Sequence, residues 1–212
     1  NQDWNKTWKE QFKPLPITPH LTIKPTWEAY QPGEGEMVIE MDPGMAFGTG
    51  HHASTRLALE FIEGLFHGDT TPPTSVLDVG TGTGILAMAA TLFGATQVLA
   101  IDNDPEAVTV AQDNIRMNNL QATITTSSTD LNAISDQYGL VIANIIHDTL
   151  IELAAPLRHR VAPGGSLILA GILEGEQTEN IRSVYQALGL IHTGTKISGE
   201  WSSLLFTNPP TP

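Results

Sequence analysis

Short apolar segments alternate with longer amphipathic segments from about residue 54 to residue 207. A short apolar run between turn residues is typical of a buried strand, and apolar residues three or four apart are typical of a helix. These patterns predict strands at residues 75–79, 97–101, 122–126, 140–143, 167–170, 190–197 and 201–207. They predict helices at residues 54–65, 85–93, 105–117, 148 to about 160, and 175–188.

This order of elements predicts the fold class. Alternating strands and helices indicate an α/β domain with a parallel sheet covered by helices on both faces. The turn at Pro163-Gly164-Gly165 leads into the strand at 167–170. The last two strands are separated only by a short turn, so we expect them to be antiparallel. A mostly parallel sheet that ends in such a hairpin distinguishes Rossmann-like methyltransferases from dehydrogenases.

The first 45 residues have a different pattern. Three aromatic residues recur every four positions, which predicts a short helix with one aromatic face: Trp4, Trp8 and Phe12. Prolines at 14, 16 and 19 then stop any helix. Short strands are predicted at 21–24 and 36–41 around a turn at 32–35. We interpret residues 1–45 as an N-terminal arm or linker packed on a main domain at 46–208.

Composition and charge narrow the class of protein. The chain has 212 residues, of which 41% are hydrophobic, enough for one domain and an arm. No apolar run approaches ~18 residues, so no membrane association is expected. The absence of cysteine excludes disulfides, thiolate zinc sites and a cysteine nucleophile, and it fits a cytoplasmic protein. A net charge of −13 argues against nucleic-acid binding and fits either a basic partner or simple solubility.

The strongest candidate site is the glycine-rich segment after the strand at 75–79. It reads Asp78-Val79-Gly80-Thr81-Gly82-Thr83-Gly84 and lies between a predicted strand and a predicted helix. Glycines in this place permit a tight turn and let the backbone approach a ligand. Amide groups at the start of the helix face the same crevice. The alternative is a tight strand–helix connection without a ligand.

Acidic residues after the next strands favour a ligand. Asp102 ends the second strand, 22 residues after Gly80, where a carboxylate can accept both hydroxyls of an adenosine ribose. We expect Asp104 to cap the following helix instead. Asp130, after the third strand, could contact an adenine amino group or could simply be a loop residue.

The ligand is better described as S-adenosylmethionine than as a dinucleotide. The dinucleotide fingerprint Gly-x-Gly-x-x-Gly fails at Ile85 when read from Gly80, and gives only a shifted match at Ala87 when read from Gly82. No Lys or Arg occurs between Arg56 and Arg116. The carboxylate of Asp78 beside the turn suits the cationic groups of S-adenosylmethionine better than it suits a phosphate.

Asn144 follows the predicted strand at 140–143 and should point into the same crevice, because ligands of open α/β sheets bind at the carboxyl ends of the strands. Its side-chain oxygen can accept a hydrogen bond from an amine. The alternative is that Asn144 caps the helix near residue 148. His147 could line the acceptor pocket, but a histidine at a helix start is the interpretation we favour.

Several segments together resemble a known family over essentially the whole chain. Residues 42–50 read Asp-Pro-Gly-Met-Ala-Phe-Gly-Thr-Gly, and His52 and Thr55 follow. The other matching segments, in order, are 78–87, Gly94-Ala95, Ile101-Asp102, Ala143-Asn144-Ile145 and Gly171-Ile172-Leu173. With these motifs the chain resembles the PrmA family of ribosomal protein methyltransferases.

The resemblance implies a seven-stranded, Rossmann-like, S-adenosylmethionine-dependent methyltransferase fold. It also implies methyl transfer to lysine side chains and to the α-amino group of the large-subunit stalk-base ribosomal protein, the one numbered eleven. By motif, the family's cofactor contacts fall on Thr55, Gly80, Asp102 and Asn144, and the loop with Phe47 and Thr49 should fold over the cofactor. The family also has a small N-terminal domain that presents the substrate, and we interpret this sequence as lacking it.

From these residues we expect cofactor binding by Thr55, Asp78, Gly80, Gly82, Asp102 and Asn144. Asn144 is also the candidate catalytic residue, which would orient the acceptor amine without a covalent nucleophile. The histidines show no metal-ligand spacing along the chain, so no metal site is expected. The alternatives are a methyltransferase of another protein, a nicotinamide-dependent oxidoreductase, and a cofactor-binding fragment that is inactive without its recognition domain.

Overall fold

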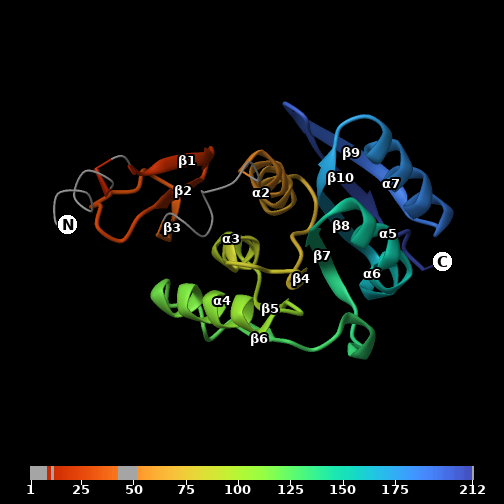
Figure 1. Cartoon of the computed structure of the whole chain (residues 1–212), viewed down its shortest axis with the longest axis horizontal. Helices are drawn as coiled ribbons and strands as arrows, with labels where there is room; N and C mark the ends of the chain where they lie inside the picture. Colours follow the sequence, from red (N-terminus) through yellow and green to blue (C-terminus); the bar gives the residue numbers. More distant parts are fainter. Residues whose placement is uncertain (1–8, 11, 43–51, 212) are drawn as a thin grey trace.

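The computed structural model describes residues 9–10, 12–42 and 52–211. Their strands form two sheets, one of seven strands and one of three strands. Figure 1 shows the larger sheet between two groups of helices, with the smaller sheet beside α2 and α3. Within the described residues, no helix combines the length and the apolar character needed to cross a membrane.

The seven-stranded sheet has the order β6-β5-β4-β7-β8-β10-β9. Its strands are β4 (Ser75–Val79), β5 (Gln97–Ile101), β6 (Ile124–Ser127), β7 (Tyr138–Asn144), β8 (Val161–Leu173), β9 (Ile191–Ser198) and β10 (Trp201–Thr207). β4 to β8 pair in parallel, and β10 pairs antiparallel with both β8 and β9. The predicted α/β fold with an antiparallel C-terminal hairpin is therefore confirmed.

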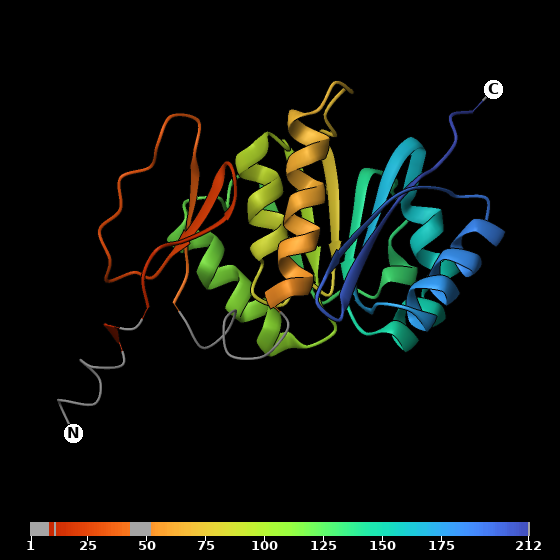
Figure 2. The ribbon, with the colours of Figure 1, turned by 90° about the horizontal axis from the view of Figure 1, so that it is seen from above.

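Helices cover both faces of this sheet, as the alternation of elements predicts. The helices are α2 (His52–His67), α3 (Ile85–Phe93), α4 (Pro105–Met117), α5 (His147–Glu152), α6 (Ala154–Arg160) and α7 (Glu176–Ala187), and a 3-10 turn, η1, spans Leu131–Ala133. Successive strand residues point to opposite faces, so Val76 packs with α2, α3 and α4 whereas Leu77 packs with α5, α6 and α7. Figure 2 shows α2, α3 and α4 in one layer.

The three-stranded sheet packs on the first helical layer. It consists of β1 (Leu15–Thr18), β2 (Leu21–Lys24) and β3 (Met37–Glu40), with β1 and β2 antiparallel and β2 and β3 parallel. Leu21 and Ile39 are fully buried in the same core as α2 and α3. The Asn118 side chain accepts from Glu40 N at 2.8 Å and donates to Glu40 O at 2.9 Å. These contacts join the small sheet to the main sheet's helices.

The structure corrects several predicted boundaries. The helix predicted at 148–160 is two helices that meet at Leu153, because Pro156 lacks an N–H and its ring would clash with the carbonyl of residue 152 in a continuous helix. The turn predicted at 163–165 lies inside β8, where Gly164 has φ +76° and the register with β7 shifts. β6 begins two residues later than predicted.

The N-terminal segment contains a strand, β1, that was not predicted. Pro14 and Pro16 were interpreted only as residues that stop a helix, but β1 is an edge strand, where proline is tolerated. The predicted strands at 21–24 and 36–41 correspond to β2 and β3. Trp4 and Trp8, which carry most of the predicted aromatic helix, lie outside the described residues.

Candidate functional site

Three neighbouring strands place the predicted site residues at one edge of the sheet. Val79 at the end of β4 pairs with Ile101 of β5 and with Ala143 of β7. The next residue along each strand is Gly80, Asp102 and Asn144, respectively. Asp102 and Asn144, which lie 22 and 64 residues after Gly80, therefore meet it at one edge of the sheet. Open α/β sheets bind their ligands at this edge.

The glycine turn is held against β5 by its backbone. The amides of Gly80 and Thr81 both donate to the carbonyl oxygen of Ile101, each at 2.9 Å. Gly80 has φ +71°, and a Cβ atom there would lie 2.6 Å from Cγ2 of Ile145. Gly80 is thus required both by its backbone conformation and by the close approach of the segment after β7.

Asp102 connects the end of β5 to this turn. Its carboxylate accepts from the amide of Gly82 and from the amide of Asp104, each at 3.0 Å. Each carboxylate oxygen keeps acceptor capacity, so Asp102 can also accept from a ligand hydroxyl. Asp104 caps α4 through the amide of Glu106, as predicted. Asp130 caps η1 by accepting from the amide of Asn132, which favours its interpretation as a loop residue.

Asp78 is buried beneath the turn, with 1% of its surface exposed. The hydroxyl of Thr81 donates to Asp78 Oδ2 at 2.7 Å, whereas Oδ1 has no hydrogen-bond partner within the described part of the chain. Burial raises the pKa of Asp78 from 3.8 to about 6, against the opposing effects of the Thr81 hydroxyl and the backbone amide of Ala87. A buried carboxylate with a spare acceptor fits a site that receives a cationic group.

Asn144 is oriented by two residues of α2. Ser54 donates to Asn144 Oδ1 at 2.7 Å, and Asn144 Nδ2 donates to the hydroxyl of Thr55 at 3.3 Å. The same side chain passes close to Gly171, where an added Cβ would lie 3.2 Å from Oδ1. The capping alternative for Asn144 is not supported, because α5 begins after Ile146 and no side chain caps it.

The structure therefore brings together all six predicted site residues. Thr55 contacts Asn144, Gly82 contacts Asp102, and Asp78 and Gly80 belong to the same turn as Gly82. Ser54 was missed by the sequence reasoning, although its position next to Thr55 in the first turn of α2 was a usable signal. Phe47 and Thr49, predicted to close over the cofactor, lie outside the described residues.

His147 is the first residue of α5, which confirms the interpretation of a helix-start histidine. Its two ring nitrogens lie 2.8 Å from Asp148 Oδ1 and 2.8 Å from Asn180 Oδ1. Both nitrogens are therefore engaged with neighbouring side chains, which argues against a role for His147 as a free base.

The family model of ribosomal protein L11 methyltransferases (PrmA) matches residues 1–209. The chain belongs to this family. A ribosomal protein L11 methyltransferase from Desulfotalea psychrophila is 46% identical over 204 residues, which are 96% of this chain and 67% of that protein. The one from Geobacter metallireducens is 48% identical over 206 residues, 97% of this chain and 66% of that protein. The chain spans about two thirds of the length of these PrmA relatives.

Solved structures agree with the PrmA assignment. A ribosomal protein L11 methylase from Lactobacillus delbrueckii subsp. bulgaricus has a TM-score of 0.83 and 32% identity, and the match covers 93% of this chain and all of that chain. Magnesium protoporphyrin IX methyltransferase from Synechocystis, solved with bound SAM, has a TM-score of 0.64, 18% identity and coverage of 77% of this chain and 88% of that chain. The second likeness shows the methyltransferase fold alone.

The raised pKa of Asp78 predicts a specific pH dependence of stability. The unfolded carboxyl ionises near 3.8, whereas the folded one keeps its proton up to about pH 6, so the folded state binds more protons between these values. The free energy of unfolding should therefore fall by roughly 1–2 kcal/mol between about pH 5 and pH 7.5 relative to Asp78→Asn, which cannot ionise. Urea unfolding of both proteins across this range measures the difference.

Asp104→Asn is the matched control, because it replaces an exposed carboxylate by the same amide. The Asp104→Asn curve should stay parallel to that of the unmodified chain. If the Asp78→Asn curve also stays parallel, the Asp78 carboxyl does not titrate as described.

Proposed function

We propose that this chain is an S-adenosylmethionine-dependent protein methyltransferase that acts on amino groups of the large-subunit stalk-base ribosomal protein, L11. The main support for the proposal is that Gly80, Asp102 and Asn144 lie together at one edge of a methyltransferase sheet. Family membership supports the reaction class, and the relatives' names supply the substrate.

The residues at this edge fit the cofactor. Nothing in the described residues occupies the place of a side chain at Gly82, so a ligand can lie directly against its backbone. Asp102 offers acceptor oxygens for ribose hydroxyls. The carboxylate of Asp78, whose Oδ1 has no partner among the described residues, gives the turn a negative charge that suits the ammonium and sulfonium groups, directly or through water. When bound, S-adenosylmethionine supplies a methyl group on a sulfonium, which a neutral amine can attack.

The remaining requirement is a neutral, oriented amine. A lysine with an ordinary pKa of ~10.4 is mostly protonated at pH 7, whereas an α-amino group with a pKa of ~7.7–8.0 is partly neutral. Ser54 and Thr55 hold the Asn144 amide with Oδ1 as the acceptor, and this oxygen has a second lone pair for an amine N–H. Asn144 therefore orients the amine, and positioning supplies much of the rate through effective molarity.

The surroundings of Asn144 suit a lysine of a basic protein, because the lysine side chain carries its amino group on an aliphatic chain. Ile146, two residues further on, is 65% exposed. An exposed apolar side chain of this kind can pack against the methylene groups of lysine. The chain's net charge of −13 favours the approach of a basic ribosomal protein, and a ribosomal substrate places the activity in the cytoplasm.

Cofactor binding should depend on Asp102 and not on its neighbour Asp104. Asp102→Ala removes the ribose acceptor and releases the amide of Gly82, so we expect the Kd for S-adenosylmethionine to rise at least about tenfold. Asp104→Ala removes only a helix cap, so the Kd should stay within about twofold. Isothermal titration calorimetry of the three proteins measures both effects. Equal Kd values for the two variants would contradict the assignment of Asp102.

Intact-mass spectrometry of L11 incubated with this chain and S-adenosylmethionine tests the reaction itself. We expect methyl-sized mass steps, and an initial rate at least about tenfold lower with Asn144→Ala, because the oriented acceptor is lost. Asn132→Ala, an exposed residue of η1, is the matched control and should keep the full rate.

The calorimetric measurement separates the possible failures of this experiment. No mass change with a chain that binds the cofactor would overturn the proposal that this chain by itself methylates L11. An undiminished rate with Asn144→Ala would overturn the role of Asn144 while leaving the reaction class in place.

A further inference from the structure

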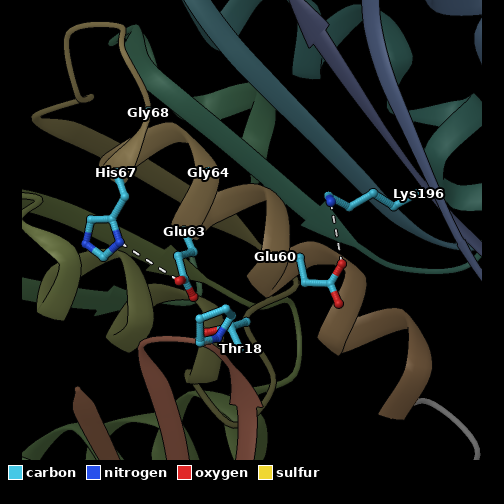
Figure 3. Close-up of a pocket in the computed structure, with 8 residues that line it drawn as sticks. Thr18, Glu60, Glu63, Gly64, His67, Gly68 and Lys196 are labelled. Atoms are coloured by element: carbon cyan, nitrogen blue, oxygen red, sulfur yellow. Dashed lines mark ion pairs between the residues drawn. The ribbon is translucent and has the colours of Figure 1, made fainter. Parts of the chain in front are cut away.

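A pocket lies away from the methyltransferase edge, where the small sheet meets the C-terminal half of α2. Its volume is about 370 Å³, and Thr18, Glu63 and His67 are among its lining residues. Figure 3 shows Glu63 and His67 projecting from α2 toward the end of β1, which carries Thr18. The pocket therefore lies between the N-terminal segment and the main domain.

Two oxygen atoms in this pocket are buried without a partner. Glu63 Oε2 and Thr18 Oγ1 have no hydrogen-bond partner within the described residues. Each residue is 7% exposed, so water reaches these oxygens poorly. An unpartnered buried polar atom costs free energy, and an unpartnered carboxylate oxygen costs more than a neutral one. The pocket thus has the acceptors for a bound cation.

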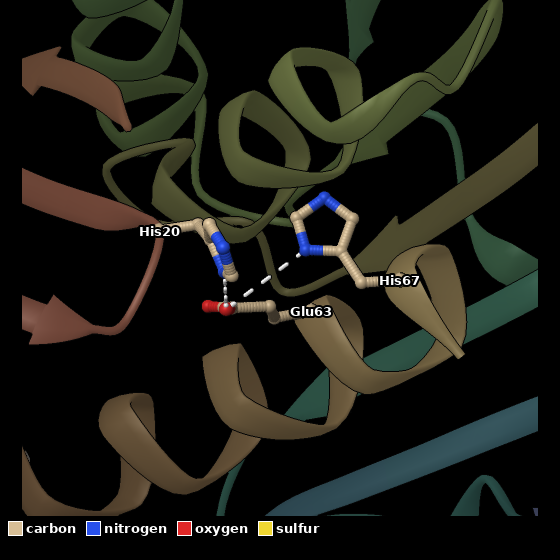
Figure 4. A group of neighbouring side chains, drawn as sticks. All are labelled: His20, Glu63 and His67. Carbon is tan, nitrogen blue, oxygen red and sulfur yellow. Dashed lines mark hydrogen bonds and ion pairs between the residues drawn. The ribbon is translucent and has the colours of Figure 1, made fainter. Parts of the chain in front are cut away.

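Three metal-ligand side chains meet at the same place. One ligand atom each from His20, Glu63 and His67 can be chosen so that all lie within 4.8 Å of one another. His20 Nδ1 is 2.5 Å from Glu63 Oε1, and His67 Nδ1 is 3.9 Å from the same oxygen. Figure 4 shows both imidazole rings turned toward the Glu63 carboxylate.

No lysine or arginine neutralises Glu63 in the part of the chain that the structure describes. The nearby ammonium of Lys196 lies 3.5 Å from Glu60, and the ion pairs of Glu63 are with the two histidines alone. Two imidazoles and one carboxylate form a ligand set that zinc takes in proteins. When both histidines are neutral, a bound metal ion would supply the positive charge that compensates the Glu63 carboxylate.

We propose that His20, Glu63 and His67 form a binding site for a divalent ion of the zinc type, with a fourth position open toward Thr18. Tetrahedral bonds of 2.0–2.2 Å place neighbouring ligand atoms roughly 3.3–3.6 Å apart. The ligand atoms that lie furthest apart, at up to 4.8 Å, must therefore approach by about 1 Å, and the His20 Nδ1–Glu63 Oε1 distance of 2.5 Å must lengthen by about 1 Å. The side chains of His20 and His67 are 45% and 39% exposed, and rotation of these rings provides the change. Glu63 and His67 are one turn apart on α2 and share a face.

The site would act as a brace between elements that are distant in sequence. His20 lies in the turn between β1 and β2, 43 residues before Glu63. The His67 ring also packs on Phe93 of α3, with centroids 5.1 Å apart. A metal ion would therefore join the small sheet to α2 and, through His67, to α3. This role does not rest on the proposed methyl transfer.

Zinc titration of the chelator-treated chain, prepared without a histidine tag, tests the proposal. Calorimetry should show one equivalent of Zn²⁺ bound with a micromolar or lower Kd. His67→Gln and Glu63→Gln should each raise this Kd at least about tenfold, because each removes one of three protein ligands. His159→Ala, an exposed histidine on α6, is the control and should leave the Kd unchanged.

Two further readouts keep the result interpretable. Circular dichroism without metal establishes that each variant is folded, and Co²⁺ in place of Zn²⁺ should give the visible absorption of tetrahedral coordination. Zn²⁺ should raise the Tm of the unmodified chain but not that of the Glu63→Gln variant. The proposal is overturned if Zn²⁺ does not saturate the chain, or if folded His20→Ala/His67→Ala protein binds it as tightly.

Discussion

The parallel pairing of β4 with β5 and β7 is the constraint on which the candidate site depends. These central strands are buried on both faces, and their register makes Val79, Ile101 and Ala143 neighbours across the sheet. The next residues along the three strands, Gly80, Asp102 and Asn144, therefore share one edge of the sheet. The hydrogen bonds from Gly80 and Thr81 to the Ile101 carbonyl extend this register into the turn. The turn is thus held by backbone hydrogen bonds to the sheet as well as by the side chains of Thr81 and Asp102.

The electrostatics of this edge distinguish it from a phosphate site. The segment from residue 57 to residue 115 has no lysine or arginine, and it carries the carboxyl groups of Asp78 and Asp102. Asp78 is buried, and its Oδ1 has no hydrogen-bond partner among the described residues, so its ionisation costs free energy that a nearby positive charge would offset. A cofactor with cationic groups satisfies this arrangement, whereas a pyrophosphate would meet repulsion. The charge of the edge and membership of a methyltransferase family lead to the same cofactor class.

Helix α2 contacts both the candidate methyltransferase site and the small sheet. Its first turn presents Ser54 and Thr55 to Asn144, and its last turns present Glu63 and His67 to the small sheet. Between Ser54 and Glu63 the helix rises about 14 Å, so the two clusters are separate sites on one rigid element. Any interaction that fixes the C-terminal half of α2 therefore also restrains the residues that orient Asn144.

The sequence by itself predicted the fold class, most element bounds and five residues of the candidate edge, because strand–turn–helix order is a local property of the chain. The sixth residue, Thr55, was predicted from the motif resemblance alone. The break in the helix at Leu153 was equally local, since Pro156 causes it, but was not predicted. The contact of Ser54 with Asn144 spans 90 residues, and that of His20 with Glu63 spans 43. Only the tertiary structure decided these contacts, because the packing of α2 against both sheets sets which side chains meet.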